Sequence, residues 1–234
     1  MGTLVNVVAV IIGGFLGLIL KNKISRRFID QVTVVLGCAV IIMGIVELIP
    51  TMIFVDTGEL KSHHSMVLIV SLVIGYGAGH WLGLANLVEK FGNYLGSKVH
   101  KEGFAKGFVS ASLLFCVGAM TFSGAILDGL GQPETLYIKS VMDFLSSIIL
   151  GATLGYGVLF SSVTVLVYQG TLFLLAGLLN GVIPADLLEM IEMVGYAIVV
   201  ILGLNLAKLT KIETANLIPA ILVPIEYYLI TLLF

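Results

Sequence analysis

The chain has 234 residues, of which 59% are hydrophobic and only 11% are charged, and its mean hydropathy is +1.12. This composition leaves too little polar surface to cover a soluble globule, so it indicates an integral membrane protein in contact with the lipid bilayer. The formal net charge is −2 and the basic residues lie in short separate clusters, which excludes nucleic acid as a partner.

Apolar runs of about 20 residues recur along the chain, and each can cross about 30 Å of hydrocarbon. They lie at residues 3–20, 32–54, 65–84, 105–127, 138–158, 162–180, 188–207 and 214–233. Lipid offers no hydrogen-bond partner to an open sheet, and the runs lack the alternation of barrel strands. We therefore predict an all-α integral membrane protein, a bundle of about eight transmembrane helices in one polytopic domain over residues 1–234.

Lysine and arginine set the expected orientation, because loops rich in these residues stay in the cytoplasm. Residues 21–27, 90–106 and 208–211 hold four, four and two of the twelve cations. With eight spans, all three clusters lie inside and both termini lie outside. This count requires two spans and a turn near Ser161–Ser162 within residues 137–179; one span with a re-entrant segment is the alternative.

Glycine is frequent within the apolar runs, and small residues at helical spacing let two helix backbones approach closely. The first and third runs carry the densest glycine faces, and each is followed by a basic loop and another glycine-bearing run. This pattern gives the hypothesis of an internal hairpin repeat, as found in transporters, and of a homo-oligomer formed through the glycine faces. Close packing in a static bundle would use the same residues.

A charge at the centre of a transmembrane helix costs about 2.5–3.5 kcal/mol, so such a residue faces a cavity or a partner. Glu226 lies well inside the last run, between Pro224 and Tyr227. We expect it to couple transport to a proton or another cation. A tilted or shallow last helix would also accommodate this carboxylate.

A second polar constellation begins with Lys139 and Asp143, which share one helix face because they are four residues apart. Neighbouring runs add further hydroxyl, amide and carboxylate groups. The predicted solute- or ion-binding residues are Asp143, Lys139, Gln169, Glu226, Asp128, Ser147, Tyr168 and Ser123. The alternative is a salt bridge at the membrane surface, with the long Lys139 side chain reaching toward water.

Motifs for other chemistries are absent from the sequence. It contains no G-x-S-x-G, H-E-x-x-H or P-loop pattern, so we expect no enzyme activity and no cofactor. Only Cys116 and Ser123, near Asp128, offer a nucleophile for an intramembrane enzyme. His63 and His64 are adjacent and therefore not spaced for one helix face, and we expect no metal site there.

A set of short motifs extends over the whole chain. It comprises Gly2-Thr3-Leu4-Val5-Asn6 with Gly13-Gly14, Leu114-Phe115-Cys116-Val117-Gly118-Ala119-Met120 before Gly124 and Asp128-Gly129, Lys139-Ser140 with Asp143, Tyr168-Gln169-Gly170, Gly203-Leu204-Asn205, and Asn216 before Ile218-Pro219. In these motifs the chain resembles the bacterial YqgA-type membrane protein family, a domain of unknown function. The resemblance implies a protein of the bacterial cytoplasmic (inner) membrane and favours transport. That family has no fixed acid at the position of Glu226, so it gives more weight to Asp128, Lys139, Asp143 and Gln169.

These observations predict a membrane transporter or channel for a small polar or charged solute or ion, driven by a gradient, with its path lined by the fourth to sixth and the eighth helices. Lys139 and Asp143 would neutralise each other until a solute replaces one partner. The alternative is an oligomeric membrane scaffold or sensor, in which the same polar groups bond only to one another.

Overall fold

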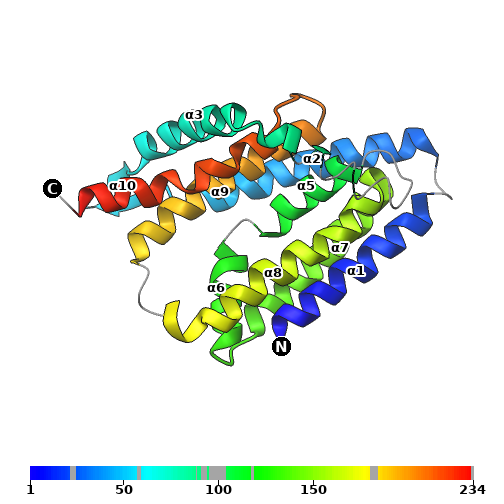
Figure 1. Cartoon of the computed structure of the whole chain (residues 1–234), viewed down its shortest axis with the longest axis horizontal. Coiled ribbons are helices and arrows are strands. Elements are labelled where there is room, and N and C mark those ends of the chain that lie inside the picture. The colour runs from blue at the N-terminus through cyan, green and yellow to red at the C-terminus, as the bar shows by residue number, and fades with distance from the viewer. Residues whose placement is uncertain are drawn as a thin grey trace. The chain divides into compact units, whose positions relative to one another are not determined.

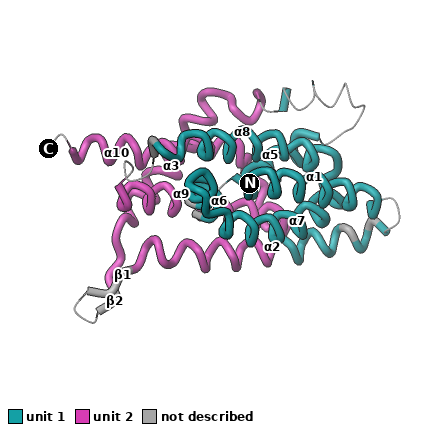
Figure 2. The backbone as a smooth tube through the Cα atoms, turned by 90° about the horizontal axis from the view of Figure 1, so that it is seen from below, with its two compact units in different colours: residues 1–36, 88–182 teal, residues 37–87, 183–234 magenta. Residues whose placement is uncertain are grey.

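The structure is a computed structural model that describes residues 1–21, 25–56, 59–87, 89–90, 94, 104–116, 119–179 and 184–232. The chain divides into two compact units (Figure 2). Unit 1 comprises Met1–Leu36 with Val88–Val182, and unit 2 comprises Gly37–Leu87 with Ile183–Phe234. Each unit has its own packed helices, and the organisation as one polytopic domain over residues 1–234 stays a prediction.

Helices dominate the described part of the chain, as the sequence predicts, and the fold is that of an all-α membrane protein (Figure 1). In chain order the elements are α1 (Gly2–Lys21), α2 (Arg26–Leu48), β1 (Ile53–Asp56), β2 (Glu59–Ser62), α3 (Ser65–Trp81), α5 (Phe104–Cys116), α6 (Ala119–Gly129), α7 (Glu134–Leu154), α8 (Tyr156–Leu179), α9 (Ala185–Leu206), the 3₁₀ helix η1 (Thr214–Ile221) and α10 (Val223–Thr231). The two strands form a small antiparallel hairpin that the sequence analysis does not predict.

Six described helical segments are long and apolar enough to cross a membrane. They are Gly2–Lys21, Asp30–Leu48, Glu134–Leu154, Tyr156–Gly177, Ala185–Leu206 and Thr214–Thr231. Helices α5 and α6 make a seventh if they count as one broken span, and α3 is a shorter apolar helix of 17 residues. A multi-pass membrane protein is confirmed, while the count of eight spans stays a prediction.

The predicted run at 32–54 extends too far, because α2 ends at Leu48 and strand β1 begins at Ile53. Three further differences concern the other runs. The run at 105–127 is not one straight helix, because α5 and α6 are bent by 80° relative to each other. Residues 137–179 do hold two helices, but the turn between them lies at Gly155 and not near Ser161–Ser162. Gly155 has φ +83°, a left-handed conformation that suits glycine, so it ends α7 where a serine would be strained.

The third difference is in the last run, at 214–233. It begins as the 3₁₀ helix η1 and becomes α-helical only in α10. Pro219 lies inside η1 and Pro224 at the start of α10, and proline has no backbone N–H for a regular α-helical hydrogen bond.

In unit 1, close backbone contacts set the directions of the helices. Helix α1 lies along α7 (Figure 1), with Gly2 against Leu136 and Gly17 against Ile148, so these two helices run parallel. The pair α5 and α6 follows α8 in the same direction, because Phe104 lies against Gly157, and Gly129 against Phe173. The opposite face of α1 exposes apolar side chains, as a lipid-facing surface requires. These include Leu4, Val8, Ile11 and Phe15.

In unit 2, glycines bring antiparallel helices together. On α2, Gly37 lies against Ala207 and Gly44 against Val200, and on α3 Gly79 lies against Asn216 while the earlier Gly75 lies against Ala220. The glycine face of α1 therefore packs on a parallel helix, and that of α3 packs on the antiparallel η1. The core of unit 2 is apolar. It contains Val67, Met190, Met193, Val194, Ile198, Leu217 and Ala220.

Candidate functional site

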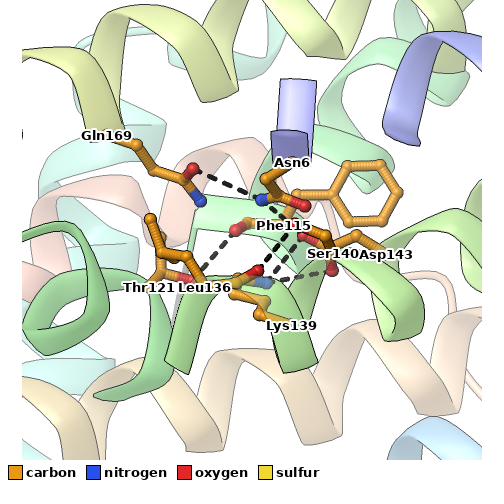
Figure 3. Close-up of polar contacts among 8 residues, drawn as sticks. All are labelled: Asn6, Phe115, Thr121, Leu136, Lys139, Ser140, Asp143 and Gln169. Carbon is orange, nitrogen blue, oxygen red and sulfur yellow. Dashed lines mark hydrogen bonds and ion pairs between the residues drawn. The ribbon is translucent and has the colours of Figure 1, made fainter. Parts of the chain in front are cut away.

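A buried polar cluster lies inside unit 1, where α1, α7 and α8 meet (Figure 3). We call Asn6, Lys139, Asp143, Ser147 and Gln169 the polar cluster. Each of them is buried, with at most 7% of the residue exposed, and each lies within a helix long enough to span the membrane. Buried polar groups in such a place need partners, so the hydrogen bonds of the cluster decide what it can do.

The centre of the polar cluster is an ion pair within α7. The Lys139 ammonium donates to both carboxylate oxygens of Asp143, with Nζ to Oδ1 and Nζ to Oδ2 distances of 2.9 Å. Only 9% of the Lys139 side chain and 7% of the Asp143 side chain are exposed. The pair is therefore a buried one, and the alternative in which Lys139 reaches toward water does not describe this structure.

Helix α1 brings an amide to the same carboxylate. The Asn6 Nδ2 group donates to Asp143 Oδ2 at 3.0 Å and to the Gln169 side-chain oxygen, Oε1, at 3.3 Å. Asn6 can bond to Asp143 because glycine residues let α1 pack closely against α7. A Cβ atom on Gly13, two turns after Asn6 on the same face, would lie 2.5 Å from the Phe144 carbonyl oxygen. Only glycine allows the two helices to come this close.

Three polar atoms of the cluster have no hydrogen-bond partner within the described residues. They are the Asn6 oxygen Oδ1, the Ser147 oxygen Oγ and the Gln169 nitrogen Nε2. The first is an acceptor, the third is a donor, and the hydroxyl can act as either. A buried polar group without a partner costs about 1–3 kcal/mol, so the cluster is incomplete as a purely structural network.

The junction of α5 and α6 lies beside the polar cluster in Figure 3. The Thr121 hydroxyl donates to the Phe115 carbonyl oxygen at 3.0 Å, across the break between the two helices. The Ser140 hydroxyl donates to the Leu136 carbonyl oxygen at 2.6 Å and so bonds only to its own helix. A broken helix frees backbone groups at membrane depth, which is the usual construction of a transporter site.

Of the eight predicted site residues, the structure links Lys139, Asp143 and Gln169 through hydrogen bonds that include Asn6, and Ser147 lies one turn after Asp143 on the same face of α7. The others lie elsewhere. Tyr168 is exposed at 36% because it points about 100° away from Gln169 on α8, and the Ser123 side chain is outside the described residues. Glu226 belongs to unit 2, in the first turn of α10, and its side chain is exposed.

Asp128, at the end of α6, has a separate set of partners. Its carboxylate accepts hydrogen bonds from the backbone N–H groups of Gly2 and Thr3 at 2.8 Å each, and from the Thr3 hydroxyl at 3.0 Å. The Met1 ammonium also contacts it, at 2.5 Å. The first N–H groups of a helix lack partners within the helix, so Asp128 caps α1 from another element. A role for Asp128 in solute binding stays a prediction.

Asn6 is the member of the polar cluster that the sequence analysis did not select as a site residue. Two signals point to it: an amide in an otherwise apolar helix, and its place on the face of Gly13 and Gly17. The sequence could not show that this face meets α7, because α1 and α7 are more than 100 residues apart in the chain.

The comparisons with known proteins agree with this membrane architecture. Residues 1–229 match a family described as a protein of unknown function, DUF554. The chain is 31% identical over 225 residues to an uncharacterized membrane protein, YdfK, of Bacillus subtilis (strain 168), covering 95% of this chain and 93% of the relative. It is 25% identical over 229 residues to the uncharacterized protein YqgA of Escherichia coli (strain K12), covering 94% and 93%.

No solved structure matches the chain. The resemblance to YqgA-type proteins, drawn above from short motifs, is confirmed over nearly the whole length of the sequence. The chain is thus a multi-pass membrane protein that belongs to the DUF554 family.

Proposed function

We propose that this protein is a gradient-driven transporter or channel for a small polar or charged solute or ion, which binds at the polar cluster of unit 1. The observation that carries the proposal is the set of three buried, unpartnered polar atoms on Asn6, Ser147 and Gln169 next to an ion pair. A network that served only to hold helices together would satisfy all its members, since each unpartnered group costs stability.

The composition of the cluster favours a solute that both donates and accepts hydrogen bonds. Gln169 Nε2 offers a donor, Asn6 Oδ1 an acceptor and Ser147 a hydroxyl. The Lys139 and Asp143 charges cancel, so the polar cluster carries no net charge. A charged group of the solute could replace one partner of the pair and bind the other, and a second solute group of opposite charge would bind the displaced partner, so that no uncompensated charge is left in the membrane.

Helix directions support the alternation of eight spans, and the expectation that both termini lie outside rests on the distribution of lysine and arginine. Successive spans alternate in direction, so the first and fifth must run alike, as must the fourth and sixth. The second and seventh must run opposite ways, as must the third and eighth. The first and fifth spans are α1 and α7, and the fourth and sixth are α5–α6 and α8; both pairs run parallel. The second and seventh are α2 and α9, and the third and eighth are α3 and η1 with α10; the contacts of α2 with α9 and of α3 with η1 are antiparallel. The location is the bacterial cytoplasmic (inner) membrane, and enzyme activity forms no part of the proposal.

Glu226 keeps its proposed role as a coupling group for a proton or cation. Its exposed carboxylate belongs to unit 2, whereas the polar cluster belongs to unit 1. The change Glu226→Gln removes the charge and keeps the shape. It should leave folding intact and abolish coupled flux, and equal flux at all pH values would dismiss this role.

A ligand screen tests the proposal. Purified protein is heated in detergent with a panel of amino acids, organic acids and inorganic ions, because a ligand that binds only the folded state raises the unfolding temperature. We expect a polar compound to raise it in the wild type and not in Gln169→Leu, with Gln132→Leu, an exposed turn residue, as the control. A scaffold with a closed polar network would respond to none of these compounds, or equally in all three proteins.

A further inference from the structure

We propose that His63, His64 and Glu189 of unit 2 bind a divalent transition-metal ion of the zinc type. This proposal is independent of the transport function and departs from the sequence-based expectation of no metal. Each of the three residues offers one ligand atom, and these atoms all lie within 4.8 Å of one another. The histidines follow strand β2, and Glu189 comes from the first turns of α9, so distant parts of the sequence form the site.

The distance between two of the candidate ligand atoms suits two ligands of one metal ion. His63 Nε2 and Glu189 Oε2 are 3.4 Å apart, which is long for a hydrogen bond between an imidazole and a carboxylate. Zinc bonds of about 2.0–2.1 Å at tetrahedral angles place neighbouring ligand atoms about 3.4 Å apart. The distance between His63 Nε2 and Glu189 Oε2 therefore equals the spacing expected of two ligands on one zinc ion.

A fourth residue, Asp186, is placed to orient one histidine. Its carboxylate oxygen Oδ1 lies 2.9 Å from His64 Nε2. A carboxylate on one imidazole nitrogen fixes the tautomer of the ring and leaves the other nitrogen for a metal, an arrangement common in zinc sites. Asp186 lies one helical turn before Glu189 on α9, so both carboxylates project from the same face.

The backbone explains how two adjacent histidines can face one ion. Adjacent residues in a regular helix or strand point in different directions, which is why the sequence argued against a metal site. His64 instead has φ 60° and ψ 5°, a left-handed conformation just before α3. This turn brings the two imidazole rings to a centroid distance of 4.2 Å in an edge-to-face arrangement.

The chemistry of the donors selects the class of ion. Two imidazoles with carboxylates suit zinc and similar borderline transition metals, whereas magnesium and calcium prefer sites made of oxygen ligands. The side chains of His63, His64 and Glu189 are 25%, 16% and 37% exposed, so an ion can enter from solution. Binding would tie the segment between the hairpin and α3 to the start of α9, the helix that supplies Met190 and Met193 to the core of unit 2.

The test uses tag-free full-length protein in detergent, first freed of metal with a chelator. Zinc chloride is titrated by calorimetry and, in parallel, in thermal unfolding. The variants His63→Ala, His64→Asn and Glu189→Gln each remove one ligand, and asparagine is chosen at 64 because it tolerates the left-handed backbone. His80→Ala is the matched control, since His80 lies at the other end of α3 and stacks on Tyr76.

We expect one zinc ion per chain, an increase in the unfolding temperature, and at least about tenfold weaker binding in the three ligand variants but not in His80→Ala. Asp186→Asn should weaken binding less. X-ray absorption of the wild-type zinc complex should show two imidazole ligands, a readout that does not depend on any variant folding. Absence of zinc binding, unchanged binding in all variants, or a metal shell without imidazole would overturn the proposal.

Discussion

Buried or half-buried side-chain amides occur in both units, and they are partnered differently. In unit 2, Asn205 donates to the Ile212 carbonyl oxygen and accepts from the Ile212 N–H and the Thr210 hydroxyl. Asn216 donates to Glu213 and accepts from the Ala85 N–H. In unit 1, Asn6 and Gln169 each use one end of the amide and leave the other end without a partner in the described structure.

The position of the amides explains this difference. Asn205 and Asn216 lie at the end of α9 and in η1, where backbone groups outside the regular helix need partners. Asn6 and Gln169 lie within long helices, whose backbone already bonds to itself. The side-chain amides of unit 2 therefore satisfy backbone groups that the fold leaves without partners, whereas the backbone of unit 1 does not need the amides of Asn6 and Gln169. In unit 2 the Ser71 hydroxyl is also buried without a partner among the described residues.

The largest expected effect comes from breaking the ion pair of unit 1. Either Lys139→Met or Asp143→Leu leaves a buried charge uncompensated and should lower the free energy of unfolding by about 3–5 kcal/mol. The double variant removes both charges and should be as stable as the wild type within about 1 kcal/mol, while losing solute response. Denaturant titration in detergent measures the stability. A double variant no more stable than the singles would show that the pair itself holds the helices together.

The next effect tests the glycine contact that presents Asn6 to α7. A Cβ atom on Gly17 would overlap the Ile148 carbonyl oxygen, so Gly17→Ala should destabilise the protein by about 1–3 kcal/mol. Gly170→Ala on α8 is the control, because nothing lies within 4 Å of a Cβ there, and it should stabilise by about 0.5–1 kcal/mol. Both variants are compared by thermal unfolding. Equal shifts in the two would contradict the packing described for α1 and α7.

An effect of similar or smaller size distinguishes the side-chain amides of unit 2 from those of unit 1. Asn205→Ala in unit 2 leaves two backbone groups of Ile212 without their partner and should cost about 1–3 kcal/mol. Gln169→Leu in unit 1 removes one accepted hydrogen bond and one unpartnered donor, so its cost should be below about 1 kcal/mol. Solute response should be lost only in the second. The reverse order of stabilities would remove the distinction between the two units.

The smallest expected effect on stability is that of Glu226→Gln. The side chain is exposed, and exposed substitutions usually change the free energy of unfolding by less than about 0.5 kcal/mol. Thermal unfolding of this variant beside the wild type measures the change. A loss of several degrees in unfolding temperature would mean that Glu226 has a structural partner in the assembled protein.

Composition and apolar runs were enough to predict the membrane class and most helices, because lipid imposes length and polarity on each span. They could not predict the break between α5 and α6 or the turn at Gly155, since neither interrupts the hydrophobicity of the sequence. Lys139, Asp143, Ser147 and Gln169 could be predicted to lie inside the protein because exposure of polar groups to lipid is costly, while their role in solute binding stays a proposal. The sequence could not predict that Asn6 lies beside these residues, because the contact of α1 with α7 depends on tertiary packing.

The central claim is that the polar cluster lies on a hydrated path, and cysteine accessibility tests it without knowledge of the solute. In a background with Cys38 and Cys116 replaced by alanine, Ser147→Cys is compared with Leu145→Cys, whose side chain is exposed on the apolar face of α7. A small water-soluble methanethiosulfonate reacts with ionised thiols and therefore needs water at the site. We predict that the Ser147→Cys protein is labelled in membranes and the Leu145→Cys protein is not; a folded Ser147→Cys protein that stays unlabelled would contradict a hydrated path at the polar cluster.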